Sequence, residues 1–133
     1  MTSDDATKSK VLVVDDAATV RLYHTSLLAE AGFQVEEAAN GLEAVEAALG
    51  TRFDLFVVDV NMPKMNGYAC VETLRSDTVG TAAPVLMIST EDRPGDADRA
   101  YRAGANLYLT KPVSAERLVR VATMLTVSED EAR

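Results

Sequence analysis

The stretch from Val11 to Asp16 reads VLVVDD and joins four apolar residues to two acidic ones. A short continuous apolar run is typical of a strand that is covered on both faces of a sheet. Three later segments are similarly apolar: Asp54 to Val58 (DLFVV), Val85 to Ile88 (VLMI) and Asn106 to Leu109 (NLYL). The segment Phe33 to Ala38 (FQVEEA) is more polar, which indicates a strand at the edge of the sheet.

The segments between these runs carry a helical period. Asn40 is a predicted N-cap with Glu43 as its capping-box partner, and Gly50 is the predicted terminator of that helix. Its predicted inward face consists of Leu42, Val45 and Leu49.

Two other helices are predicted from the same period. The first ends at Gly32, and its inward residues are Val20, Leu27, Leu28 and Ala31. The last begins near Ser114, and its inward residues are Leu118, Val121, Ala122 and Leu125. A weaker helix between Gly95 and Ala103 offers mainly alanines to the core, and we expect it to be the most mobile one.

Strict alternation of strands and helices predicts an α/β protein with a doubly wound parallel sheet, because parallel neighbours need crossover connections. Five strands and five helices are expected. The polar second strand favours the flavodoxin-like order 2-1-3-4-5, in which that strand lies at an edge.

The bulk properties fit one domain at residues 10–125, with a polar tail at 1–9 and an acidic tail at 126–133. The chain has 133 residues, 47% of them hydrophobic, and neither a membrane span nor a signal peptide is evident. We therefore expect a cytoplasmic protein. Its net charge of -8 disfavours nucleic acid and anionic membranes as direct partners.

Two single residues could carry chemistry, but each is more simply explained as a core residue. Cys70 has no second cysteine to pair with and lies in a helix-like stretch, so a buried thiol is expected. His24 is in phase with Val20 and Leu28, which indicates a core or boundary position and not a phosphodonor.

Polar residues follow all four apolar runs, at the edge of the sheet where ligands bind in this architecture. These residues are Asp15 and Asp16, Asp59, Ser89 and Thr90, and Thr110 and Lys111. Any one of the aspartates could be a turn former or an N-cap. The whole set at one edge is harder to explain in that way.

Three neighbouring carboxylates repel one another unless protons or a cation neutralise them. Mg²⁺ suits oxygen ligands and leaves positions for a phosphate oxygen, and no histidine or cysteine at the strand ends favours zinc. Lys111 and Ser89 could neutralise the oxygens of a transferring phosphoryl group. A carboxylate can accept that group as an acyl phosphate.

The sequence resembles the receiver domain of two-component response regulators, and most closely the single-domain, CheY-like chemotaxis type. The resemblance extends from Lys10 to about Leu125. It is carried by VLVVDD at 11–16, DVNMPKMNG at 59–67, PVLMIST at 84–90 and AGANLYLTKP at 103–112.

The resemblance implies a role for each residue at this edge. It makes Asp59 the phosphoacceptor and Asp16 the main Mg²⁺ ligand, assisted by Asp15 and the backbone carbonyl of Asn61. Ser89 would bind a phosphoryl oxygen and Lys111 would pair with another. The resemblance also implies a cis Lys111–Pro112 peptide bond and a switch aromatic at Tyr108, although an edge-strand tyrosine with a solvated hydroxyl is the simpler alternative.

The resemblance further implies a phosphoryl supply from a sensor histidine kinase or a histidine phosphotransfer protein. A monomer that signals by binding a flagellar motor switch or another effector is expected, with a relay intermediate as an alternative. A degenerate receiver without phosphorylation is a weaker possibility. A dehalogenase-like Mg²⁺ phosphatase would need Asp-x-Asp, where this chain has Ala17. We expect a phosphoacceptor and not a multiple-turnover enzyme.

Overall fold

The computed structural model describes residues 9–127, in which strands and helices alternate along the chain. The strands are β1 (Lys10–Val14), β2 (Gln34–Ala38), β3 (Leu55–Asp59), β4 (Val85–Ser89) and β5 (Leu107–Thr110). The helices are α2 (Ala18–Glu30), α3 (Gly41–Gly50), α4 (Gly67–Arg75), α5 (Asp96–Ala103) and α6 (Ala115–Thr126). The predicted alternation is therefore confirmed, with element ends that shift by one or two residues.

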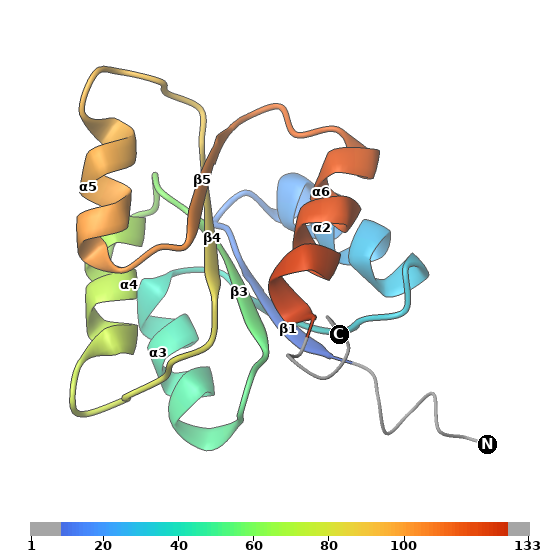
Figure 1. Ribbon diagram of the computed structural model, residues 1–133. Coiled ribbons are helices and arrows are strands. Elements are labelled where there is room, and N and C mark those ends of the chain that lie inside the picture. The colour runs from blue at the N-terminus through green and yellow to red at the C-terminus, as the bar shows by residue number, and fades with distance from the viewer. Residues whose placement is uncertain (1–8, 128–133) are drawn as a thin grey trace.

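The five strands form one parallel sheet in the order β2-β1-β3-β4-β5. This is the predicted flavodoxin-like order, with the polar second strand at an edge. Helices α2 and α6 lie together on one face of the sheet, while α3, α4 and α5 cover the other face (Figure 1). The carboxyl ends of the central strands therefore open between two helical layers.

The core is divided by the sheet into two hydrophobic clusters. In β1, Val11 and Val13 belong to the cluster under α2 and α6, and Leu12 and Val14 belong to the cluster under the other three helices. This alternation follows from the two-residue period of a strand. The α6 residues Leu118, Val121 and Ala122 are buried as predicted, and Leu125 packs against their cluster.

Helix α3 is correctly predicted in position but not in orientation. Asn40 is its N-cap, since its Oδ1 accepts a 2.9 Å hydrogen bond from the amide of Glu43. The predicted inward residues Leu42 and Leu49, however, are 48% and 58% exposed, and the helix buries Gly41 and Ala44 instead. Close packing against the loop before α4 explains this, because a Cβ on residue 41 would lie 2.8 Å from the Met65 carbonyl oxygen.

The C-terminal ends of α2 and α3 differ in detail from the prediction. Gly50 is the last residue of α3, and Thr51 is its C-cap. Helix α2 ends as predicted before Gly32, which has a φ of 106° and donates its amide to the Ala29 carbonyl. Ala31, predicted to face inward, is exposed because it is already the C-cap residue of α2.

The guanidinium of Arg75 fastens the end of α4 to two neighbouring loops. It donates hydrogen bonds of 2.6–3.1 Å to four oxygens, namely the carbonyls of Thr81, Ala83 and Gly104 and the side-chain oxygen of Asn106. Burial lowers the pKa of Arg75. The side chain is therefore a structural clamp built almost wholly from backbone acceptors.

Cys70 and His24 are both core residues, as predicted. Cys70 is 0% exposed, and burial raises the pKa of its thiol to about 12. His24 is 4% exposed, and burial lowers its pKa. None of the helices within residues 9–127 is long and apolar enough to cross a membrane. The predicted tails at 1–9 and 126–133 lie mostly outside the described residues, and α6 continues through Thr126.

Candidate functional site

Asp15, Asp16 and Asp59 meet at the carboxyl edge of the sheet, as expected. Asp15 and Asp16 follow β1, and Asp59 is the last residue of β3, its neighbour in the sheet. Each offers a carboxylate oxygen, and these three oxygens lie within 4.8 Å of one another. Asp15 and Asp59 are only 2% and 5% exposed, whereas Asp16 is exposed. The cluster therefore has a buried floor and one carboxylate at its mouth.

Both carboxylate oxygens of Asp15 have partners within the protein. Its Oδ1 accepts a 2.9 Å hydrogen bond from the amide of Ala17, and its Oδ2 accepts a 3.1 Å hydrogen bond from Nζ of Lys111. The Arg21 side chain donates to the backbone carbonyl of Asp15 at 2.6 Å. These contacts fix the orientation of the Asp15 carboxylate.

The Asp59 carboxylate has fewer hydrogen-bond partners among the described residues than that of Asp15. Its Oδ1 lies 3.1 Å from Nζ of Lys111, but the angles are not those of a hydrogen bond, and this buried oxygen has no hydrogen-bond donor among the described residues. Burial raises the pKa of Asp59 from 3.8 to about 6, and the Asp15 carboxylate adds to the effect, while Lys111 opposes it. Asp59 is thus a buried carboxylate whose Oδ1 is held by an ion pair with Lys111 and by no hydrogen bond from the described part of the chain.

Lys111 follows β5, the edge strand that is two positions from β3 in the sheet, and brings a positive charge to this cluster. Burial alone would lower its pKa, but the Asp59 and Asp15 carboxylates outweigh burial, and its pKa is raised. The Lys111 amide donates a 2.7 Å hydrogen bond to the Ser89 carbonyl, and the Lys111–Pro112 peptide bond is cis, the geometry implied by the resemblance. The backbone thereby positions the ammonium group between two carboxylates.

Ser89 ends β4 beside Asp59 and is also buried. Its hydroxyl oxygen accepts a 3.0 Å hydrogen bond from the amide of Glu91, which leaves the hydroxyl hydrogen available for a ligand. The next residue, Thr90, accepts a 3.3 Å hydrogen bond from the side-chain amide of Asn61. This contact links the loops after β3 and β4 at the mouth of the site, and no sequence motif predicts it.

The loop after Asp59 turns back tightly into α4. The amide of Gly67 donates a 2.9 Å hydrogen bond to the carbonyl of Val60, and Asn66 caps the helix by accepting from the amide of Ala69. A Cβ on residue 67 would lie 2.5 Å from the carbonyl oxygen of Asp59. Only glycine allows this approach, so the start of α4 helps to fix the backbone of Asp59.

Tyr108 in β5 is half-buried, and its hydroxyl donates a 2.7 Å hydrogen bond to the backbone carbonyl of Glu91. Glu91 is the same residue whose amide contacts the Ser89 hydroxyl. Tyr108 and Ser89 are therefore connected through one residue of the loop between β4 and α5.

The donor set at the cluster fits a hard divalent cation. All three clustered ligands are carboxylate oxygens, and one buried oxygen lacks a hydrogen-bond donor within residues 9–127. A divalent cation would offset the repulsion and burial that raise the pKa of Asp59. The single ammonium group of Lys111 cannot neutralise three carboxylates.

Comparison with known proteins agrees with this geometry. The family model of the response regulator receiver domain matches residues 11–123. The chain belongs to this family. The receiver domain is 36% identical to protein PilH of Pseudomonas aeruginosa over 112 residues, which cover 84% of this chain and 93% of PilH.

Solved receiver structures have the same fold. The chemotaxis response regulator CheY4 of Vibrio cholerae is 37% identical, with a TM-score of 0.83 over 90% of this chain and 99% of CheY4. The receiver domain of the sensor histidine kinase PA1611 from P. aeruginosa, solved with a magnesium ion coordinated in its active-site cleft, is 26% identical. Its TM-score is 0.83, over 91% of this chain and 99% of that one. This receiver domain is thus a CheY-like one.

A cavity of about 370 Å³ opens beside the acidic cluster of the receiver domain. Asp16 and Asn61 line it on the side of the cluster, and Tyr68, Arg93 and Arg99 line it from α4 and from the segment that begins α5. The sequence did not indicate the last three residues, because they belong to no recurring motif and meet only through the packing of two helices.

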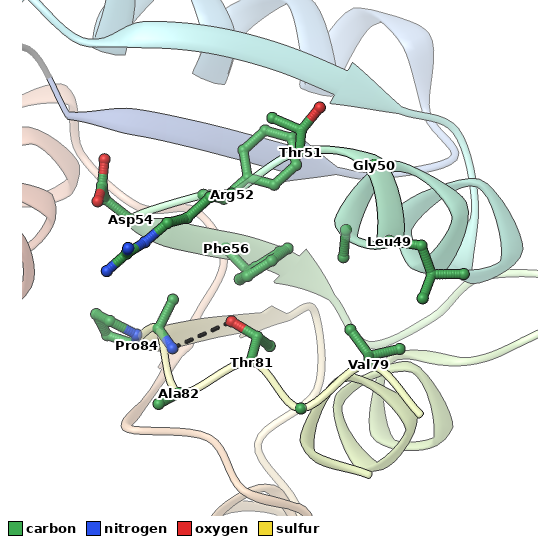
Figure 2. Close-up of a pocket in the computed structure, with 14 residues that line it drawn as sticks. Leu49, Gly50, Thr51, Arg52, Asp54, Phe56, Val79, Thr81, Ala82 and Pro84 are labelled. Carbon is green, nitrogen blue, oxygen red and sulfur yellow. Dashed lines mark hydrogen bonds between the residues drawn. The ribbon is translucent and has the colours of Figure 1, made fainter. Parts of the chain in front are cut away.

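A larger cavity, of about 700 Å³, lies at the other end of the receiver domain (Figure 2). It is formed where the chain enters β3 and β4, with Leu49 and Arg52 on one side and Val79 and Thr81 on the other. The Thr81 hydroxyl accepts a 3.2 Å hydrogen bond from the amide of Ala83 there. The acidic cluster lies at the opposite ends of these strands, so this cavity is separate from the candidate site.

Proposed function

We propose that this chain is a phosphorylation switch in which Asp59 accepts a phosphoryl group in a Mg²⁺-dependent reaction, within a receiver unit at residues 10–125. One observation carries the proposal. Asp59 is buried next to Asp15 and Lys111, and its Oδ1 has no hydrogen-bond donor among the described residues. A buried carboxylate that the protein leaves short of hydrogen bonds, beside a second carboxylate and a lysine, is suited to take up a cation and to accept a phosphoryl group.

The ligands proposed for Mg²⁺ are the carboxylates of Asp15, Asp16 and Asp59 and the backbone carbonyl of Asn61. The magnesium ion in the related PA1611 receiver domain supports this assignment. When bound, Mg²⁺ would supply charge neutralisation for the carboxylates and for the phosphoryl oxygens. The exposed position of Asp16 leaves the mouth of the cluster accessible to the ion.

In the proposed transfer, a carboxylate oxygen of Asp59 forms a bond to phosphorus as the bond between phosphorus and the leaving group breaks. The leaving group keeps the electron pair of the broken bond, and the product is an acyl phosphate on Asp59. Lys111, whose Nζ lies 3.1 Å from Oδ1 of Asp59, can move its ammonium group onto a phosphoryl oxygen. The Ser89 hydroxyl can donate its free hydrogen to another.

The proposed signal starts at the contact between Ser89 and Glu91. If the Ser89 hydroxyl turns toward the phosphoryl group, the loop that holds Glu91 must shift, and the 2.7 Å hydrogen bond from Tyr108 to Glu91 must change with it. The surface of α5, β5 and α6 then has a second conformation. A partner that binds one conformation better than the other reads the signal.

The proposed phosphoryl source is a sensor histidine kinase or a histidine phosphotransfer protein, and the proposed target is a protein of a chemotaxis or motility system. Similarity to the chemotaxis regulator CheY4 favours such a target. The alternative within the same chemistry is a relay, in which the phosphoryl group moves on from Asp59 to a histidine of another protein.

Intact mass spectrometry after incubation with acetyl phosphate tests the proposed chemistry. Wild-type protein should gain one phosphoryl group with Mg²⁺ and none with excess EDTA, and Asp59→Asn should gain none. The variant Asp77→Asn, which changes an exposed aspartate of a loop, should behave as the wild type. An unmodified wild-type protein in Mg²⁺ would contradict the proposal, and many turnovers of a phosphate ester would support a phosphatase instead.

A further inference from the structure

The cavity beside the acidic cluster connects the proposed phosphorylation site to a cationic wall. Asp16 and Asn61 line the cavity at the end that adjoins the acidic cluster, and Arg99 lines it from α5. Helices α4 and α5 lie next to each other on the same face of the sheet (Figure 1). A molecule that reaches Asp59 past Asp16 and Asn61 therefore has this cavity as an adjoining space.

Arg99 is held in place without being neutralised. Its guanidinium carbon lies 4.1 Å from the centre of the Tyr68 ring, a cation–π contact that orients the group. In the part of the chain that the structure describes, no carboxylate lies within 4 Å of its nitrogens. This free positive charge is unexpected at a site rich in carboxylates, in a chain with a net charge of -8.

Arg93, the other arginine of the cavity, differs in this respect. It forms ion pairs with Glu91 and Asp96, both at 3.4 Å, and its side chain is 68% exposed. Its charge is already balanced locally by these two carboxylates, whereas Arg99, which is also exposed, has no such partner among the described residues. Arg99 is therefore the residue of this wall that has charge to offer to an anion.

We infer that Arg99, positioned on the Tyr68 ring, selects the phosphodonor by binding the carboxylate that leaves when an acyl phosphate is the donor. The inference rests on the proposed function of Asp59. In the transfer, a carboxylate oxygen of Asp59 bonds to phosphorus, the bond from phosphorus to the acyl oxygen breaks, and the acyl oxygen keeps the electron pair. The departing acid thus becomes a carboxylate anion, and a guanidinium group in the adjoining cavity stabilises its developing charge.

A donor with a different leaving group separates this role from a general one. Phosphoramidate, protonated on nitrogen, transfers the same phosphoryl group by breaking a phosphorus–nitrogen bond, and its nitrogen leaves as neutral ammonia. Arg99 has no developing negative charge to stabilise in that reaction. Loss of Arg99 should therefore slow the acyl phosphate reaction selectively.

The test compares rates of Asp59 phosphorylation, followed by intact mass, with acetyl phosphate and with phosphoramidate in excess Mg²⁺. Arg99→Gln should be about three- to tenfold slower with acetyl phosphate, a range expected of a solvent-accessible charge, and within about twofold of wild type with phosphoramidate. Arg99→Lys keeps the charge and should recover at least half of the wild-type rate.

Arg102→Gln is the matched control, since it removes an exposed arginine from the same helix but outside the cavity lining. It should leave both rates unchanged. An Arg99→Gln protein that reacts at the wild-type rate with acetyl phosphate, or that is slowed equally with both donors, overturns the inference while the proposed function stands. A wild-type protein that gains no phosphoryl group from either donor overturns both.

Discussion

The ammonium nitrogen of Lys111 lies 3.1 Å from Oδ1 of Asp59 but donates no hydrogen bond to that oxygen. Its hydrogen bond goes to Asp15 instead. Asp59 is therefore attracted by a positive charge but is not stabilised enough to offset burial, and its pKa stays raised, at about 6. In the metal-free protein, the ionised Asp59 should therefore lower the free energy of unfolding.

Replacing Asp59 by Asn should stabilise the metal-free protein at pH 7.5, by about 1–2 kcal/mol. Because the pKa of Asp59 is raised from 3.8 to about 6, the folded state binds more protons than the unfolded state in this window. The stabilisation from protonated Asp59 is complete below about pH 3.8 and is lost as pH rises through about 6. The advantage of Asp59→Asn should therefore be smaller at pH 5, as urea unfolding in EDTA would measure.

The control for this prediction is Asp77→Asn, which neutralises an exposed aspartate away from the cluster. Its stability should equal that of the wild type at both pH values. An Asp59→Asn variant that is less stable than wild type at pH 7.5 without metal would show that the buried carboxylate is not destabilising.

Adding Mg²⁺ should raise the melting temperature of the wild-type protein, since binding to the folded state alone is stabilising. At a concentration ten times the dissociation constant the gain is about 1.4 kcal/mol, or about 4 °C for a chain of this size. Asp16→Asn removes one carboxylate at the mouth of the cluster and should shift the effect to higher Mg²⁺ concentration in calorimetric scans. The same concentration dependence in wild type and Asp16→Asn would argue against the proposed ligand set.

Much of the candidate site could be predicted from the sequence because its residues occupy the ends of apolar runs. The run before Asp15 and the run before Asp59 identify buried parallel strands, and parallel strands bring such residues to one edge. The lack of a hydrogen bond to Oδ1 of Asp59 from the described residues could not be predicted in this way, since it depends on the angle at which Lys111 approaches.

The orientation of α3 and the contact between α4 and α5 were not predicted correctly, for a different reason. Leu42 and Leu49 mark the most hydrophobic side of α3, but that helix packs too closely against the chain before α4 to bury large side chains. The contact between Arg99 and Tyr68 was missed because it depends on how α4 and α5 pack. Apolar periodicity identifies elements well and the spacing between them poorly.

Replacing Arg75 by Met should cost about 2–4 kcal/mol, because the half-buried carbonyls of two loops would lose their donors together. Arg75→Lys should be nearly as costly, since one ammonium group cannot reproduce the planar fork. Urea unfolding gives both values. Arg102→Met, at an exposed position, should change stability by less than about 0.5 kcal/mol. Equal effects at positions 75 and 102 would contradict the clamp.

Replacing Gly67 by Ala should destabilise the protein by about 2–3 kcal/mol, since the new Cβ would lie 2.5 Å from the Asp59 carbonyl oxygen. It should also slow phosphorylation, because the backbone of Asp59 must move. Gly50→Ala is the matched substitution, because nothing lies within 4 Å of a Cβ added at this position. Since Gly50 is part of α3, this variant should be more stable than the wild type by about 0.5–1 kcal/mol. Denaturation curves and phosphorylation rates of the two variants decide the prediction, which fails if Gly67→Ala is as stable as wild type.

The four strand ends at the site come from widely separated parts of the chain, so that Lys111 contacts an aspartate 96 positions before it. Only a piece of the sequence that spans at least residues 15–111 contains the acidic pair, the central aspartate, the serine and the lysine together. The chemical competence of this protein is therefore a property of the finished molecule. Under the proposed function, a chain that is still being synthesised, or one that is cut in the crossover from β4 through α5 to β5, would accept no phosphoryl group. Every phosphorylated molecule would therefore be a completely folded one.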